Sequence, residues 1–171
     1  MATRPILLTI LAMTLFGSPE ARAGEDSPSD YQSAPGVCQG AFPASAGSTL
    51  RAKPLGIVNE GSAPAFVSCA NQTRAGLTIE WYGIRVGSTN AAPMTISCTL
   101  VHGYGLGLPA TYVTKSVTVT NGSAPGIIFY ASELPDQVLA YPQVSCGLPA
   151  GGVVHYTVVV YSTAPPARQS D

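Results

Sequence analysis

The chain has 171 residues, with 8 Lys or Arg against 9 Asp or Glu and a net charge of −1. So few positive charges exclude nucleic acid and an anionic membrane surface as natural partners. Because charge is sparse, Ser, Thr, Gly and Asn must solubilise much of the surface, a composition that is common in exported β proteins.

The first 23 residues, Met1–Ala23, have the order of a cleavable signal peptide. Arg4 gives a positively charged amino-terminal region, Ile6–Phe16 is an apolar run of 11 residues, and residues 21–23 (Ala-Arg-Ala) match a cleavage site. An uncleaved anchor or a buried amino-terminal helix is the alternative. The run is too short to span a bilayer, which needs about 20 residues, and no second such run follows. We therefore expect a secreted or periplasmic protein without a membrane span.

Cleavage would leave 148 residues (171 − 23), which fits one domain. It would also remove two arginines and one glutamate, so that six basic and eight acidic residues give a charge of −2. Residues 24–36 and 163–171 are polar and rich in Ser and Pro, and we expect a flexible leader and a flexible tail there. The domain is expected to span residues 37–162.

Short segments rich in β-branched and aromatic residues recur through this domain, between clusters of Gly, Pro, Asn and Ser. They predict eight strands, at residues 55–59, 65–69, 77–86, 94–101, 115–120, 127–131, 138–146 and 153–162. In Met94–Val101 apolar side chains alternate with Thr and Ser, which is typical of a sheet with one wet face. Seven or eight such strands predict an all-β fold, a single antiparallel β-sandwich that is Ig-like or jelly-roll-like.

One of these segments, residues 77–86, carries a change of face. Ile79 and Trp81 share one parity along the chain, whereas Ile84 has the other. Because an extra residue in a strand moves every later side chain to the opposite face, this change predicts a β-bulge at residues 82–83.

All four cysteines, Cys38, Cys69, Cys98 and Cys146, follow the expected cleavage site. An even number in an oxidising compartment predicts two disulfides rather than catalytic thiols or zinc ligands. Three pairings are possible, and the spacing alone does not choose among them. We favour Cys98 with Cys146 and Cys38 with Cys69, and alternation predicts that Cys69, Cys98 and Cys146 face the core.

We find no catalytic, cofactor-binding or metal-binding constellation in the sequence. His102 and His155 have no acid within three residues, and no G-x-S-x-G motif is present. Glu133 and Asp136 are the one close pair of carboxylates in the expected domain, and the Leu-Pro between them indicates a turn. A glycosidase would need two carboxylates that face each other across a cleft, and two oxygen donors are too few for calcium.

Aromatic side chains are the remaining indication of function. Flat rings with a polar tip suit half-wet contacts with sugars or proteins. Most rings lie within expected strands, where packing is their default role. Tyr104 and Tyr112 lie instead in or beside a glycine-rich connection that begins at His102, and they are our candidate binding surface.

Short motifs surround three of the cysteines and form the last strand. They are V-S-C at residues 67–69, I-S-C-T-L at 96–100, V-S-C-G-L-P at 144–149 and Y-T-V-V-V-Y at 156–161. Together with an early cysteine, they resemble a loose group of small exported bacterial proteins that are mostly uncharacterised. The resemblance covers about residues 37–161. It implies a disulfide-bonded β-sandwich and assigns no activity.

The leading hypothesis is a secreted, non-enzymatic module that acts by binding or as a structural surface, with a cell-surface protein or polysaccharide as its partner. One alternative is an exported hydrolase assembled from distant strands, which would bring His102 or His155 within hydrogen-bond reach of a carboxylate inside a concavity. Another is a carbohydrate-binding module, which would present two or three exposed coplanar rings.

Overall fold

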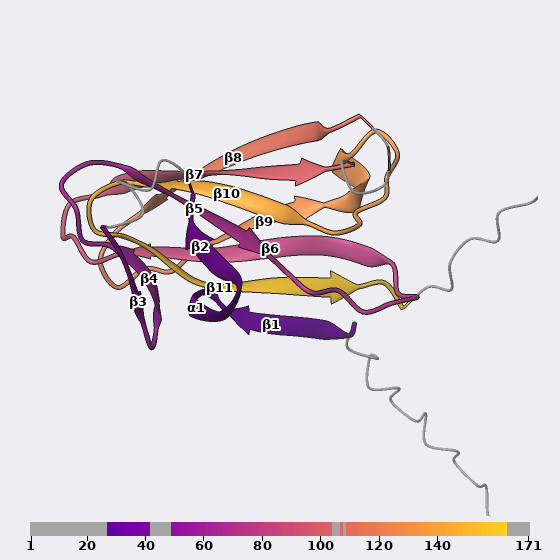
Figure 1. The fold of residues 1–171 in the computed structure, drawn as a ribbon, viewed down its shortest axis with the longest axis horizontal. Helices are drawn as coiled ribbons and strands as arrows, with labels where there is room; N and C mark the ends of the chain where they lie inside the picture. The colour runs from indigo at the N-terminus through magenta and orange to yellow at the C-terminus, as the bar shows by residue number, and fades with distance from the viewer. Residues whose placement is uncertain (1–26, 42–48, 104–106, 108, 164–171) are drawn as a thin grey trace, which may run out of the picture.

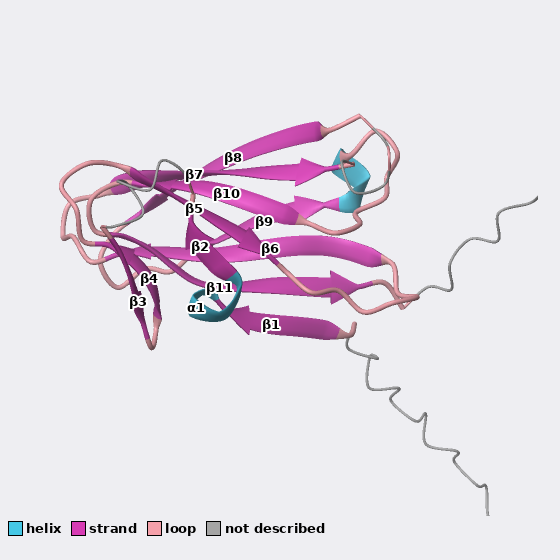
Figure 2. Ribbon diagram, viewed as in Figure 1, coloured by secondary structure: helices cyan, strands magenta, loops and turns pink. Residues whose placement is uncertain are grey.

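The structure is a computed structural model, and it describes residues 27–41, 49–103, 107 and 109–163. The predicted signal peptide, Met1–Ala23, lies outside the described residues, as do residues 164–171 of the predicted tail. The described residues form eleven strands, one four-residue helix and one short 3-10 turn. Nearly all of the regular secondary structure in the described residues is therefore β, as Figure 2 shows.

The strands form two antiparallel sheets that pack face to face (Figure 1). The six-stranded sheet has the order β3 (Leu50–Lys53), β4 (Gly56–Asn59), β11 (Gly152–Tyr161), β6 (Ile79–Ser88) and β9 (Gly126–Tyr130), and β1 (Ser29–Ser33) also pairs with β11. The five-stranded sheet has the order β2 (Cys38–Gly40), β5 (Ala65–Ala70), β10 (Gln143–Leu148), β7 (Met94–His102) and β8 (Thr111–Val119). The predicted antiparallel β-sandwich is confirmed.

The core lies between the two sheets. Tyr82, Phe129 and Tyr161 of the six-stranded sheet are fully buried against Leu100 and Leu148 of the five-stranded sheet and their neighbours. Each large apolar side chain buried in this way contributes roughly 1.5–3 kcal/mol to the hydrophobic stabilisation. The outer faces of both sheets are thus left available for other contacts.

Both predicted disulfides are present. Cys38 pairs with Cys69 across β2 and β5, and Cys98 pairs with Cys146 across β7 and β10. Each pair joins residues that lie directly opposite each other on neighbouring strands of the five-stranded sheet. Cys69, Cys98 and Cys146 are buried in the core, as the alternation predicts.

The prediction of a flexible leader over residues 24–36 is wrong for residues 29–36, which form regular secondary structure. Ser29–Ser33 forms β1 along β11, and helix α1 (Ala34–Val37) then carries the chain to β2 in the other sheet. This segment is polar because it adds to an existing sheet edge, where backbone hydrogen bonds hold it and little apolar area is needed. The predicted count of seven or eight strands is too low, because β1, β2 and β3 are short and carry no clear apolar pattern.

The predicted strand at residues 138–146 is too long, because β10 begins only at Gln143. The preceding segment leaves the extended conformation: Gln137 and Tyr141 have positive φ angles of 54° and 49°. Leu139 still reaches the core and forms an isolated bridge with Ile79. The sequence pattern indicates a strand here because the loop packs an apolar side chain, Leu139, into the core.

The β-bulge lies earlier in β6 than predicted. Val160 and Tyr161 of β11 pair with Trp81 and Ile79, so the extra residue is Glu80 rather than residues 82–83. Because the bulge precedes Trp81, that side chain lies on the outer face of the sheet, while Ile79 and Tyr82 point into the core with 3% and 0% exposure. The correction places the chain's single tryptophan on the outside of the sandwich.

Within the described residues, no helix has the length and apolar character that crossing a membrane requires.

Candidate functional site

His102 tests the hydrolase hypothesis most directly. It ends β7, its side chain is 2% exposed, and its Nε2 atom lies 3.2 Å from Oδ2 of Asp136. Its Nδ1 atom lies 3.4 Å from the carbonyl oxygen of Ala140. A histidine does therefore meet a carboxylate, but this one is buried and lines neither of the hollows described below. The pair ties the loop after β9 to the end of β7.

The other predicted acid–base candidates also have structural partners. Glu133 accepts hydrogen bonds from Lys115 Nζ at 2.6 and 2.7 Å, and the backbone N–H of Val138 donates to Asp136 at 3.2 Å. Nδ1 of His155 lies 2.8 Å from the carbonyl oxygen of Leu55, and His155 forms no ion pair with a described residue. Within the described part of the chain, no three His, Cys, Asp or Glu side chains are grouped so that they could hold a metal ion.

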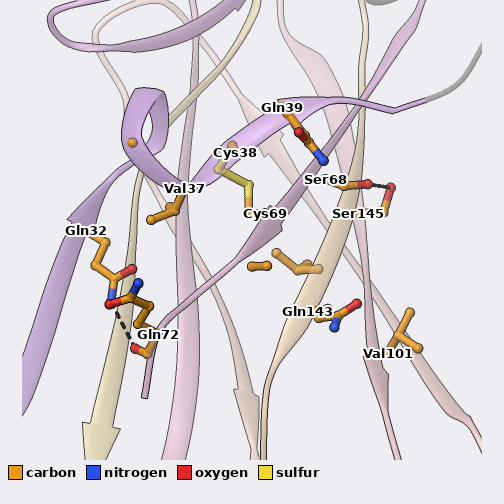
Figure 3. Close-up of a pocket in the computed structure, with 13 residues that line it drawn as sticks. Gln32, Val37, Cys38, Gln39, Ser68, Cys69, Gln72, Val101, Gln143 and Ser145 are labelled. Carbon is orange, nitrogen blue, oxygen red and sulfur yellow. Dashed lines mark hydrogen bonds between the residues drawn. A yellow bond between two sulfur atoms is a disulfide. The ribbon is translucent and has the colours of Figure 1, made fainter. Parts of the chain in front are cut away.

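A first hollow, of about 700 Å³, lies over the outer face of β5 and β10 and beside α1 (Figure 3). We call it the glutamine groove, because four glutamines line it: Gln32, Gln39, Gln72 and Gln143. Nε2 of Gln32 donates to the Gln72 carbonyl at 3.0 Å, and Oγ of Ser68 donates to Ser145 Oγ at 3.3 Å. Its described lining includes no charged side chain and no aromatic ring.

One of the two tyrosines of the candidate surface predicted from sequence, Tyr112, lies near this groove. Tyr112 on β8 is 67% exposed and pairs with Val101, which lines the groove. Tyr104 lies outside the described residues. A binding role for these two tyrosines therefore stays a prediction.

A second concave region lies on the outer face of the six-stranded sheet, and we call it the aromatic cleft. It consists of two adjoining hollows of about 570 and 150 Å³, which share Tyr31, Arg85 and Tyr156 in their linings. Trp81 lines the smaller hollow, while His155 lines the larger one beside the turn between β3 and β4. Three strands that are distant in sequence, β1, β6 and β11, therefore build one site.

Strand register explains why these side chains meet. Tyr156 lies opposite Arg85 of β6 on one side and opposite Ser33 of β1 on the other. In an antiparallel pair, directly opposite residues point to the same face, about 4.5–5.5 Å apart. One row of the cleft thus runs Arg85–Tyr156–Ser33, and the next row places Tyr31 beside Val158.

The rings differ in exposure and in orientation. Tyr31 is 67% exposed, Trp81 and Tyr156 are half-buried, and Tyr130, opposite Trp81, is exposed. The ring centroids of Tyr31 and Tyr156 lie 5.7 Å apart, with their planes inclined at 60°. These two rings form an angled wall rather than the coplanar platform expected of a carbohydrate-binding module.

A glycine gives the cleft its floor. A Cβ atom at Gly83 would lie 2.9 Å from Cγ1 of Val158 and 3.0 Å from Cζ3 of Trp81. The first distance is shorter than real Cβ atoms show and the second is at the tight limit, so any larger residue at position 83 would push against both Val158 and the indole of Trp81. The indole can lie over the sheet because residue 83 has no side chain.

No family model matches the sequence, and no curated protein matches it. Among solved structures, the chain is similar to TmCBM61 in complex with beta-1,4-galactotriose, with a TM-score of 0.41 and 12% identity over 81% of this chain and 92% of that one. It is also similar to the Podospora anserina GH26-CBM35 beta-(1,4)-mannanase, with a TM-score of 0.39 and 8% identity over 85% of this chain and 30% of the mannanase. Both identities and both TM-scores are too low to assign a function to this chain.

Proposed function

We propose that the protein is a non-enzymatic carbohydrate-binding module whose site is the aromatic cleft. The observation that carries the proposal is the convergence of Tyr31, Trp81 and Tyr156 with Arg85 on one concave sheet face. A sugar ring has an apolar C–H face and polar edges, so it fits a site that combines aromatic walls with a few polar groups.

Polar groups at the rim of the cleft fit the same ligand. Gln32, Ser33 and His155 line the larger hollow, where amide, hydroxyl and imidazole groups can bond to sugar hydroxyls. No Asp or Glu is among the described residues that line the cleft, so a two-carboxylate glycosidase mechanism has no groups there. The two disulfides fit an extracellular or periplasmic location, where polysaccharides are found.

The glutamine groove is a second candidate surface, since amides and hydroxyls also bind sugars. We rank it lower because a ring that could stack on a sugar is absent from its described lining. Tyr112 is an exposed ring opposite Val101, which lines the groove, and it serves as the comparison for the cleft.

The test is a titration of the protein against a panel of soluble polysaccharides by isothermal titration calorimetry. Tyr31→Ala or Trp81→Ala is expected to weaken binding about tenfold, the effect of losing roughly 1.4 kcal/mol of ring contact. Tyr112→Ala is the matched control, because Tyr112 and Tyr31 are both 67% exposed tyrosines on strands. If Tyr112→Ala weakens binding and Tyr31→Ala does not, the site lies on the five-stranded sheet and not in the aromatic cleft. If no polysaccharide binds, the proposed function is wrong.

A further inference from the structure

Arg85, in the middle of β6, is the one Arg or Lys among the described residues that line the aromatic cleft. Arg85 is exposed, and it lies opposite Tyr156 on one side and Gly126 on the other. Gly83, two residues earlier on the same face, forms the floor. A Cβ at Gly126 would meet no heavy atom closer than 4.0 Å. Two of the neighbours of Arg85 on this face, Gly83 and Gly126, are thus glycines without side chains.

Arg85 also differs from the other described cations in its charge balance. The other described Arg and Lys side chains form four ion pairs: Arg51 and Lys53 with Glu60, Arg74 with Asp30, and Lys115 with Glu133. Arg85 forms no salt bridge with any residue that the structure describes. In the described part of this sparsely charged chain, the cation without an ion pair is therefore the one that lies in the cleft.

We infer that the cleft selects an acidic polysaccharide, a uronate polymer whose carboxylate is held by Arg85 while its sugar ring packs against Tyr156 and Tyr31; this inference rests on the proposed function. A guanidinium is a planar fork of N–H donors that matches a carboxylate with two parallel hydrogen bonds. In a uronate the carboxylate is attached to the sugar ring itself. Because Arg85 and Tyr156 are directly opposite neighbours, a single sugar can reach both.

Desolvation favours the same ligand class. A sugar that stacks against Tyr156 also covers Arg85 and removes water from its guanidinium. Covering a cation without giving it a partner opposes binding, whereas a carboxylate replaces the lost water with a charge-assisted bond. A neutral polymer offers only hydroxyl acceptors, so it covers Arg85 without compensating its charge.

The experiment compares polygalacturonate with its fully methyl-esterified form, which keeps the backbone and loses the charge. We expect the wild-type protein to bind the acid form at least about tenfold more tightly at low salt, and added salt to reduce that preference. Arg85→Gln is expected to bind both forms equally. The control is Arg51→Gln, which removes one charge from a side chain that lines neither hollow of the cleft, and it should keep the wild-type preference.

The two proposals fail in different ways. Equal binding of both polymers by the wild-type protein, or binding of neutral polysaccharides alone, would overturn the inference about Arg85 and leave the proposed function standing. A preference for the acid form that Arg85→Gln retains would also overturn it. Absence of binding to every polysaccharide would overturn both. Circular dichroism of each variant shows that a lost preference does not come from loss of the fold.

Discussion

Gly83 shapes the aromatic cleft by its lack of a side chain. Its missing side chain leaves room for the indole of Trp81, and a methyl group there would lie 3.0 Å from Trp81 Cζ3 and 2.9 Å from Val158 Cγ1. Val158 is buried and Trp81 is half-buried, so a methyl group at residue 83 would force both side chains to shift, and the indole is the one with solvent beside it. A single methyl group added at residue 83 therefore tests whether binding depends on the position of the Trp81 indole.

We predict that Gly83→Ala displaces Trp81 and weakens polysaccharide binding several-fold, at a cost in stability of about 1 kcal/mol. Because Trp81 is the only tryptophan, intrinsic fluorescence reports on it without a label. The emission maximum should shift to longer wavelength as the ring becomes more exposed. Unchanged emission together with an unchanged dissociation constant would show that Gly83 does not shape the cleft.

Carboxylates that are paired in the folded protein make its stability depend on acid pH. The hydrogen bond from His102 holds the pKa of Asp136 below its usual value, and a backbone N–H from Val138 adds to the effect. Arg74 and Lys53 lower the pKa values of Asp30 and Glu60 in the same way. A carboxyl whose folded pKa is lowered stabilises the protein above its unfolded pKa, near about 3.9–4.3, and that contribution is lost as pH falls through the folded value.

The melting temperature should therefore fall as pH decreases below about 4, and it should fall less steeply in Asp136→Asn than in the wild-type protein. Differential scanning calorimetry between neutral pH and the acid range measures both curves. Parallel curves for the two proteins would mean that the His102–Asp136 contact does not contribute to acid sensitivity.

At the scale of elements, β8 is a long edge strand, and Lys115 lies in its middle on the inner face. Lys115 pairs with the core-facing Cys98, and its Nζ atom donates to the Ile128 carbonyl at 2.7 Å and to Glu133. An inward-pointing charge on an edge strand disfavours pairing with another chain. Here it also bridges the edges of the two sheets.

We predict that Lys115→Ala lowers the free energy of unfolding by about 1–3 kcal/mol, the range for hydrogen bonds that involve a charged group. It should also increase self-association through the freed edge. Thr118→Ala, on the outer face of the same strand, is the control and should stay within about 0.5 kcal/mol of wild type. Urea unfolding and light scattering measure the two effects. Equal stability of both variants would show that the bridge contributes nothing.

The disulfides join elements within a single sheet, so each should stabilise the domain independently of the other. Replacing Cys98 and Cys146 by Ala, or Cys38 and Cys69 by Ala, should each cost roughly 2–4 kcal/mol, because the closed loops of 48 and 31 residues are comparable in length. Urea unfolding without reductant is the measurement. A double variant that unfolds at the wild-type urea concentration would contradict this expectation.

The elements also show what the sequence could predict. The strand Met94–His102 was predicted almost to the residue, because its alternation directly reflects one buried and one wet face. The bulge in β6 was predicted but misplaced, since a change of parity between Ile79 and Ile84 is compatible with an extra residue anywhere between them. β1 was missed because an edge strand held by backbone hydrogen bonds needs no apolar pattern.

At the scale of the whole molecule, the sandwich separates two outer faces of different chemistry. The five-stranded sheet presents hydroxyls and amides around the glutamine groove, and the six-stranded sheet presents rings and Arg85 around the aromatic cleft. The disulfides and the fold class could be predicted because they depend on local patterns and on cysteine number. The cleft could not, because it requires the register of β1, β11 and β6 and the position of the bulge at Glu80.

The most direct test of the central claim is a nuclear magnetic resonance titration of the isotope-labelled protein with polygalacturonate fragments. If the ligand occupies the aromatic cleft, the indole N–H of Trp81 and the amides of Tyr31, Arg85 and Tyr156 will shift, while those around Ser68 in the glutamine groove stay in place. Shifts centred on the groove, or a spectrum unchanged throughout the titration and in a parallel titration with neutral oligosaccharides, would contradict the claim.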